Sequence, residues 1–355
     1  MKHLLITGMG RSGTTLLDKL LTNHKEIDVL SQPLPLLFVE VKKQFLKSKG
    51  IDKYYALNDD SISRGYLTCD LDNFLANFSI THAEIERIFH SMRDYSGQYT
   101  KNEFDSIGDS RSQHGFNNVI EKSLNYFLLK TELTYLGIKE TMCEEFLPYL
   151  CETGYKCIVI IRDPRDVLAS ANYPRGTKHF GKKRPSLFIL RSWRKSVEYV
   201  YSLQKHNNFL FLRYEDLVIN PYFELNKITE FLGLDNFPED YFENGIFDRN
   251  GKIWQANSSF RTKGSFISRE SKGIYKKMLS TEEIDYAEAI CKYEMDWLNY
   301  PRELGIVTAR SIENFKDTGI EYNQYLPANY SSQSENILEE LKRIKIFSHF
   351  YFQDD

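Results

Sequence analysis

The feature that most constrains this chain is a run of small residues directly after a short apolar segment near its amino terminus. Residues 3–7 are apolar and have the length of a buried strand, which Gly8 ends. The segment Gly8-Met9-Gly10-Arg11-Ser12-Gly13-Thr14-Thr15 follows, and leucines then recur on one face of a helix expected from Thr14 to about Asn23. In such a loop, backbone N–H groups and the amino terminus of the helix can surround an anion. The sequence therefore predicts an anion site here.

This glycine loop departs at one position from the phosphate-binding pattern G-x-x-x-x-G-K-[ST], known as the P-loop. Thr14 stands where the pattern has lysine, and the cation of the loop is Arg11 instead. Because that lysine reaches the terminal phosphates of a nucleoside triphosphate, its loss disfavours ordinary triphosphate chemistry. A tight strand–helix turn that binds nothing is the alternative interpretation.

Strand and helix patterns alternate along most of the chain. We expect further strands at Ile27–Leu30, Leu136–Ile138, Cys157–Ile161 and Phe209–Leu212, with helices between them. This alternation predicts an α/β fold with a central parallel sheet flanked by helices. The resemblance of the glycine loop to the P-loop implies an architecture like that of the P-loop-containing nucleotide hydrolases. We expect one domain over residues 1–300, with a helical insertion at 47–113, and a partly helical C-terminal extension at 301–355.

Composition excludes several classes of partner. The chain of 355 residues has 46 Lys+Arg and 49 Asp+Glu, and this balance disfavours nucleic acid as a partner. The five cysteines form no C-x-x-C pair and the eight histidines show no metal-binding spacing, so we expect a reduced, metal-free, cytoplasmic protein. No apolar run approaches the roughly 20 residues of a membrane span. We therefore expect no membrane segment and no cleaved leader.

A second motif follows the strand at Cys157–Ile161. It reads Arg162-Asp163-Pro164-Arg165-Asp166-Val167-Leu168-Ala169-Ser170. An arginine at a strand end and a serine two helical turns later can converge on one phosphate, the arginine as a forked cation and the serine as a neutral donor. Alone, the string is typical of an ion-pair cluster at a helix start. After the glycine loop, a phosphate site is the favoured interpretation.

Arg-Ser-Gly-Thr-Thr after a first strand resembles the 5′-phosphosulfate loop of sulfotransferases that use 3′-phosphoadenosine 5′-phosphosulfate (PAPS), and later segments resemble the bacterial and carbohydrate-type branch. The resemblance implies that Arg11 contacts the sulfuryl group and the leaving oxygen. It assigns the 3′-phosphate to Arg162 and Ser170, which have the family's spacing. It assigns the 5′-phosphate to Ser12, Gly13, Thr14 and Thr15. Gly10 and Arg11 complete the set of residues expected to bind PAPS in this loop.

Three later segments extend the resemblance. Tyr214 matches a family tyrosine that lies near the adenine, although a core aromatic is the alternative. Lys272 and Gly273 match a loop that closes over the 3′-phosphate, and Arg261-Thr262-Lys263-Gly264 is a rival for that role. The basic segment Arg175–Arg184 is interpreted as a lid or, more simply, as a solvated loop.

Sulfuryl transfer is an in-line displacement that needs alignment and charge stabilisation, which cationic side chains can supply without a metal ion. Lys139 could support Arg11 on the sulfuryl oxygens. Glu140 is the nearest proton acceptor, at a place where cytosolic members carry histidine. The alternative is that Lys139 and Glu140 form a strand-end pair exposed to water. Outside candidates for the base are Glu40 and His114, together with Gln32, which sits where some relatives carry glutamate but cannot itself accept a proton.

The predicted function is that of a cytoplasmic sulfotransferase that moves a sulfuryl group from PAPS to a hydroxyl or amine of a small-molecule, carbohydrate or peptide acceptor. The insertion at 47–113 would lie over the acceptor side. One rival is a P-loop kinase with Asp163 in the metal-binding role. The other is a nucleotide-binding protein without turnover. The sequence leaves the acceptor and the oligomeric state open.

Overall fold

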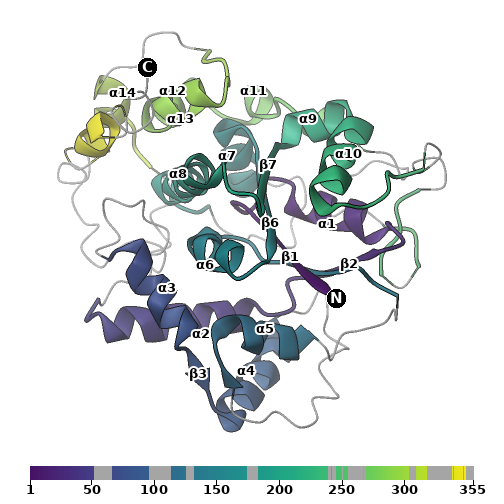
Figure 1. Cartoon of the computed structure of the whole chain (residues 1–355). Helices are drawn as coiled ribbons and strands as arrows, with labels where there is room; N and C mark the ends of the chain where they lie inside the picture. Colours follow the sequence, from purple (N-terminus) through teal and green to yellow (C-terminus); the bar gives the residue numbers. More distant parts are fainter. Residues whose placement is uncertain are drawn as a thin grey trace.

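The centre of the protein is a sheet of five parallel strands in the order β2-β5-β1-β6-β7 (Figure 1). The computed structural model describes residues 1–51, 66–95, 113–124, 132–173, 183–238, 241, 245–249, 251–254, 267, 269–303, 309–317, 338, 340–346 and 348. The strands are β1 (Lys2–Thr7), β2 (Ile27–Ser31), β5 (Tyr135–Lys139), β6 (Lys156–Ile161) and β7 (Phe209–Arg213). The α/β fold predicted from the alternation of strands and helices is confirmed.

Helices cover both faces of this sheet. In β6, Ile158 and Ile160 belong to one buried apolar cluster, whereas Val159 and Ile161 belong to another. Because successive side chains of a strand point to opposite faces, this strand has a core on each side and reads as a continuous apolar run. The first cluster includes α1 (Thr14–Thr22), α9 (Tyr214–Ile219) and α10 (Pro221–Leu232). The second includes α2 (Pro35–Ser48), α6 (Leu147–Glu152), α7 (Pro164–Asn172) and α8 (Ser186–Leu203).

The described part of the insertion is mainly helical and packs on α2. Its elements are α3 (Thr68–Ala76), β3 (Ser79–Ile80), α4 (His82–Tyr95) and β4 (Gln113–His114), and α5 (Phe116–Leu124) follows. The ring of Phe38 on α2 meets those of Phe116 and Phe146 edge-on, at centroid distances of 5.3 and 4.9 Å. These aromatic side chains fill a core between the insertion and the sheet layer. The place of the insertion over an acceptor stays a prediction.

The carboxyl-terminal elements pack beside α7 and α8. The short 3-10 turn η4 (Glu144–Phe146) lies elsewhere in the chain, between β5 and α6. Residues 340–346, drawn in yellow in Figure 1, are also helical. Among the helices described here, none has the length and apolarity needed to cross a membrane. The carboxyl-terminal elements are η5 (Arg269–Ser271), α11 (Tyr275–Met278), α12 (Thr281–Ile290), α13 (Lys292–Trp297) and α14 (Ala309–Glu313).

The glycine loop requires glycine at two positions. Gly8 has φ +146°, and a Cβ atom there would lie 2.6 Å from the carbonyl oxygen of Ile160 on β6. Gly13 has φ +100°, and its Cβ would lie 2.4 Å from the ring of Tyr214 at the start of α9. Side chains rarely adopt such φ values, and neither neighbour leaves room for one. Close packing against β6 and α9 therefore fixes the path of the loop.

We expect Gly13→Ala to lower the free energy of unfolding by about 1–3 kcal/mol, because the added methyl group collides with Tyr214 and strains the backbone. Gly10→Ala is the matched control, since nothing lies within 4 Å of its Cβ position. The control should change stability by less than about 0.5 kcal/mol. Urea unfolding of both variants measures the difference. Equal stabilities would contradict the packing described for this loop.

Candidate anion-binding site

The predicted site residues lie at one edge of the sheet because all its strands are parallel. Thr7 at the end of β1 is opposite Val159 of β6, and Ile161 is opposite Arg213 at the end of β7. Lys139 ends β5 opposite Ser31 of β2. The glycine loop, the motif that begins at Arg162, and Tyr214 therefore emerge at the carboxyl ends of neighbouring strands, where open α/β sheets bind ligands.

The two predicted phosphate motifs touch each other. Nε of Arg11 donates a hydrogen bond of 3.0 Å to Oγ of Ser170 on α7. Nη1 of Arg162 donates one of 3.1 Å to the carbonyl oxygen of Arg11. The backbone of Arg11 has φ +77°, a strained value for a residue with a side chain, which turns the loop toward α7. The structure thus brings Arg11, Arg162 and Ser170 together from three separate segments.

Two buried polar atoms at this junction have no hydrogen-bond partner among the described residues. They are Oγ of Ser12 and Nε of Arg162, and the two side chains are at most 2% exposed. Leaving such donors unpaired costs free energy, which an anion could recover. The nearby amino terminus of α1 begins at Gly13, which has no side chain to cap it, and its first turn carries no acidic residue. These features favour a negatively charged ligand.

A turn from the carboxyl-terminal part of the chain closes over Arg162, and the sequence predicted it only in part. The carbonyl oxygen of Ser271 accepts a hydrogen bond from Nη2 of Arg162. Oγ of Ser271 lies 2.5 Å from the hydroxyl of Tyr214. The carboxylate of Asp166 accepts hydrogen bonds from the backbone N–H groups of Gly273 and Tyr275, at 2.7 and 3.0 Å. Ser271 and Asp166 are therefore site residues that the sequence reasoning missed.

Of the two later residues predicted to bind the nucleotide, Tyr214 is buried and Lys272 is exposed. The ring of Tyr214 is fully buried beneath the glycine loop, with the guanidinium of Arg162 4.7 Å from its centroid. Its contact with adenine stays a prediction. Lys272 is exposed, next to the buried Ser271. Residues 261–264, the rival for its role, lie outside the described residues, as do 175–182 of the basic segment.

Asp163, the metal-binding candidate of the kinase alternative, is engaged by Arg165. Its Oδ1 accepts from the backbone N–H of Arg165 and from Nε of the same residue, both at 2.9 Å. Oδ2 accepts from Nη2 at 2.6 Å. Asp163 thus caps α7 and pairs with a guanidinium, which disfavours a metal-binding role. Among the side chains that the structure describes, no three His, Cys, Asp or Glu residues gather as a metal site.

Lys139 and Glu140 are buried, so the alternative of a water-exposed pair is wrong: each is 1% exposed. Nζ of Lys139 lies 3.4 Å from Oγ1 of Thr15, 3.5 Å from Oε1 of Gln32 and 3.7 Å from Oδ2 of Asp18. Burial lowers the pKa of Lys139, and the negative charge of Asp18 opposes that shift. This ammonium group therefore lies beside the glycine loop, close to where a group held by Thr15 would sit.

Glu140 is held by the start of α2. Its Oε1 accepts a hydrogen bond of 2.7 Å from the backbone N–H of Leu34. Burial raises the pKa of Glu140 to about 8, so the carboxyl is mostly protonated at neutral pH. Of the outside candidates, Glu40 pairs with Arg87 of α4 at 3.8 Å, and His114 is exposed in β4. Glu140 thus remains the candidate base nearest to Lys139.

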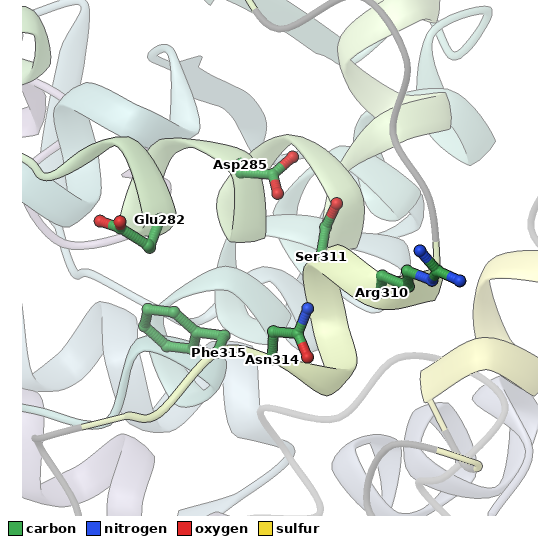
Figure 2. Close-up of a pocket in the computed structure, with 6 residues that line it drawn as sticks. All are labelled: Glu282, Asp285, Arg310, Ser311, Asn314 and Phe315. Atoms are coloured by element: carbon green, nitrogen blue, oxygen red, sulfur yellow. The ribbon is translucent and has the colours of Figure 1, made fainter.

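A separate pocket of about 230 Å³ lies between α12 and α14 (Figure 2). None of the predicted site residues lines it. Glu282 and Asp285 come from α12, and the others come from α14 or directly follow it. The lining residues are Glu282, Asp285, Arg310, Ser311, Asn314 and Phe315.

Fold and site together define an α/β protein with a candidate anion-binding site at the carboxyl edge of its sheet. Residues 1–299 match the family model of the sulfotransferase domain, and the chain belongs to this family. A curated relative, carbohydrate sulfotransferase 1 of Danio rerio, is 21% identical over 92% of this chain and 83% of its own length. Sulfotransferase 2A1 of Rattus norvegicus is 30% identical over 34% of this chain, which spans only 47% of that relative.

Solved structures of sulfotransferases are similar at low identity. The sulfotransferase domain from the curacin biosynthetic pathway has a TM-score of 0.45 and 17% identity, covering 85% of this chain and 99% of that one. Mouse sulfotransferase SULT7A1, complexed with PAP, has a TM-score of 0.41 and 12% identity, covering 79% of this chain and 80% of that one.

The contact between Asp18 and Lys139 can be tested directly. Asp18→Asn should lower the pKa of Lys139 further, because the charge that opposes the burial shift is removed. NMR titration of ¹³C-labelled lysine side chains measures this. Ser31→Ala is the control, because it removes only the 2.7 Å hydrogen bond to Oδ2 of Asp18 and no charge. An unchanged titration midpoint in Asp18→Asn would show that Asp18 does not stabilise the ammonium form.

Proposed function

We propose that this protein transfers a sulfuryl group from PAPS to a hydroxyl or amine of its acceptor. The observation that carries the proposal is the direct contact between the glycine loop and the Arg162/Ser170 motif, through Nε of Arg11 and Oγ of Ser170 at 3.0 Å. Because the two anion-binding motifs meet, one small nucleotide with phosphate groups at both ends could contact them together. Membership of the sulfotransferase domain family supports the reaction class.

The unpartnered polar atoms fit such a ligand. Backbone N–H groups at the start of α1, which no side chain caps, would bind the 5′-phosphate. Oγ of Ser12, which has no partner among the described residues, would bind it as well. Arg162 and Ser170 would bind the 3′-phosphate. The hydrogen bond between Arg11 and Ser170 would then be exchanged for bonds to the nucleotide. Arg11, released from Ser170, would turn toward the sulfuryl group.

In the proposed reaction, an acceptor oxygen or nitrogen forms a bond to sulfur as the bond from sulfur to the 5′-phosphate oxygen breaks. Arg11 and Lys139 stabilise the charge on the sulfuryl and leaving oxygens. The acceptor's proton passes to the ionised carboxylate of Glu140, a general-base contribution that is typically about 10²–10⁴-fold. The bisphosphorylated product is 3′-phosphoadenosine 5′-phosphate (PAP).

A nucleotide-binding protein without turnover is the second candidate, because the carboxylate of Glu140 already accepts a hydrogen bond from Leu34. A kinase is disfavoured by Thr14 in place of lysine and by the pairing of Asp163 with Arg165. The acceptor class, small molecule, carbohydrate or peptide, and the cytoplasmic location stay predictions.

Nucleotide binding is the first test. We expect PAP to raise the melting temperature strongly and ADP with Mg²⁺ to raise it little; a ligand at 100 times its Kd adds about 2.7 kcal/mol to stability. Ser170→Ala should weaken the binding of PAP about 3–10-fold, which is the value of one lost hydrogen bond. The binding of adenosine 5′-phosphate should weaken less than twofold. Ser123→Ala, another buried serine, is the control. Stabilisation by ADP with Mg²⁺ alone would favour the kinase.

The role of Glu140 has a distinct pH signature. A base with a pKa of about 8 ionises as pH rises, so the turnover of the wild-type protein should increase with pH, reach half of its maximum near pH 8 and level off above that. Glu140→Gln should lower turnover by about 10²-fold or more and remove this dependence, while PAP affinity changes little. A wild-type pH profile in Glu140→Gln would exclude Glu140 as the base. PAP binding without transfer to any acceptor would favour the second candidate.

A further inference from the structure

The C-terminal extension lies beyond residues 1–299 of the family match, yet it buries charged side chains against the domain. Glu340 is 1% exposed and Arg343 is 2% exposed, both in the helical segment 340–346. Charged side chains are almost never buried to this degree without partners. The described part of the extension is therefore packed into the structure.

The partners of Glu340 are arginines of α8. Nε of Arg191 donates a hydrogen bond of 2.7 Å to its Oε1, and Nη2 of the same residue contacts that oxygen as well. Nη1 of Arg194 lies 3.8 Å from Oε2. Arg343 adds a third guanidinium, with Nη1 2.8 Å from Oε1. Removing one partner of a buried ion pair leaves an uncompensated charge, which strongly disfavours the packed arrangement.

The same part of α8 reaches the candidate site. Trp193 lies between the two arginines in sequence and is fully buried. Its Nε1 donates a hydrogen bond of 2.7 Å to the carbonyl oxygen of Arg162. Helix α8 therefore binds the backbone of Arg162 through Trp193. On the same helix, the neighbouring side chains of Arg191 and Arg194 contact Glu340.

Two more contacts tie the extension to this region. At the start of α8, the backbone N–H of Ser186 donates to Oδ2 of Asp317 at 2.5 Å. Glu303 accepts a hydrogen bond of 2.8 Å from the hydroxyl of Tyr275, the first residue of α11, which directly follows the turn that begins at Ser271. The extension therefore contacts both α8 and the helix that follows the turn closing over Arg162.

We propose that the C-terminal extension positions the 3′-phosphate site, with Glu340 as a positioning residue that acts through α8 and Trp193 on Arg162. This inference rests on the proposed function. If it is correct, the extension raises the affinity for a nucleotide that carries a 3′-phosphate. The affinity for adenosine 5′-phosphate, which lacks that group, does not depend on the extension.

The test uses the full chain and Glu340→Gln, which keeps the size of the side chain and removes its charge. Lys342→Gln is the matched control, on the exposed side of the same helical segment. Isothermal titration calorimetry gives Kd for PAP and for adenosine 5′-phosphate. We expect Glu340→Gln to raise the Kd of PAP at least fivefold and that of adenosine 5′-phosphate less than twofold. The control should change neither.

Trp193→Phe provides an independent arm, because it keeps all the charged partners of Glu340 and removes the indole N–H, together with part of the ring. It should reproduce the selective loss for PAP. Combining it with Glu340→Gln should cost little more than either change alone, since both act on Arg162 through one path. If Glu340→Gln does not fold, the ratio of the Kd of PAP to that of adenosine 5′-phosphate in Trp193→Phe tests the inference instead.

Three results would overturn the inference. If PAP fails to bind the wild-type protein, the proposed function fails and the inference with it. If PAP binds normally but the ratio of the two Kd values is unchanged in Glu340→Gln, the extension only stabilises the fold and the proposed function stands. The third is an unchanged ratio in Trp193→Phe, which would show that the contact with Arg162 does not transmit the effect.

Discussion

The structure around the candidate site depends on the burial of one guanidinium group, that of Arg162. Its Nη atoms donate to the carbonyl oxygens of Arg11 and Ser271, and its own carbonyl accepts from Trp193. A buried cation is tolerated only when such groups surround it, so each of these segments must adopt its observed path for Arg162 to be accommodated. The glycine loop, α8 and the turn that begins at Ser271 are coupled through this side chain.

The same arrangement leaves two buried hydrogen-bond donors without a partner among the described residues. Nε of Arg162 and Oγ of Ser12 are buried without a partner within the described residues, although the side chains that carry them are fixed. Donors held in place before a ligand arrives need little reorganisation when it binds, which is the basis of electrostatic preorganisation. These unpaired donors, one of which belongs to a cation, therefore favour an anion as the predicted ligand.

Local patterns predicted the elements well. The apolar run Cys157–Ile161 became β6, and the run Phe209–Leu212 became β7. Contacts between distant segments were not predictable in this way: Ser271 meets Tyr214 across 57 residues, and no local signal marks such a pair. The burial of Lys139 and Glu140 was open for the same reason, because this charged strand end is buried by contacts with α1 and with Leu34 at the start of α2.

The helix α8 connects the two ends of the site. Through Trp193 it holds Arg162, and through Lys195 it pairs with Glu144 and Glu145, at 3.2 and 2.9 Å, in the turn after the segment that carries Lys139 and Glu140. Met142 in that segment donates its N–H to the carbonyl oxygen of Gly8, so the turn also contacts the glycine loop. In-line transfer requires the reacting groups to be aligned closely, and a misplacement of about 1 Å can cost 10²-fold in rate. The buried ion pairs of Arg191, Arg194 and Lys195 fix the middle of α8. A helix held in this way would keep the predicted phosphate-binding residue Arg162 and the candidate base Glu140 at constant separation.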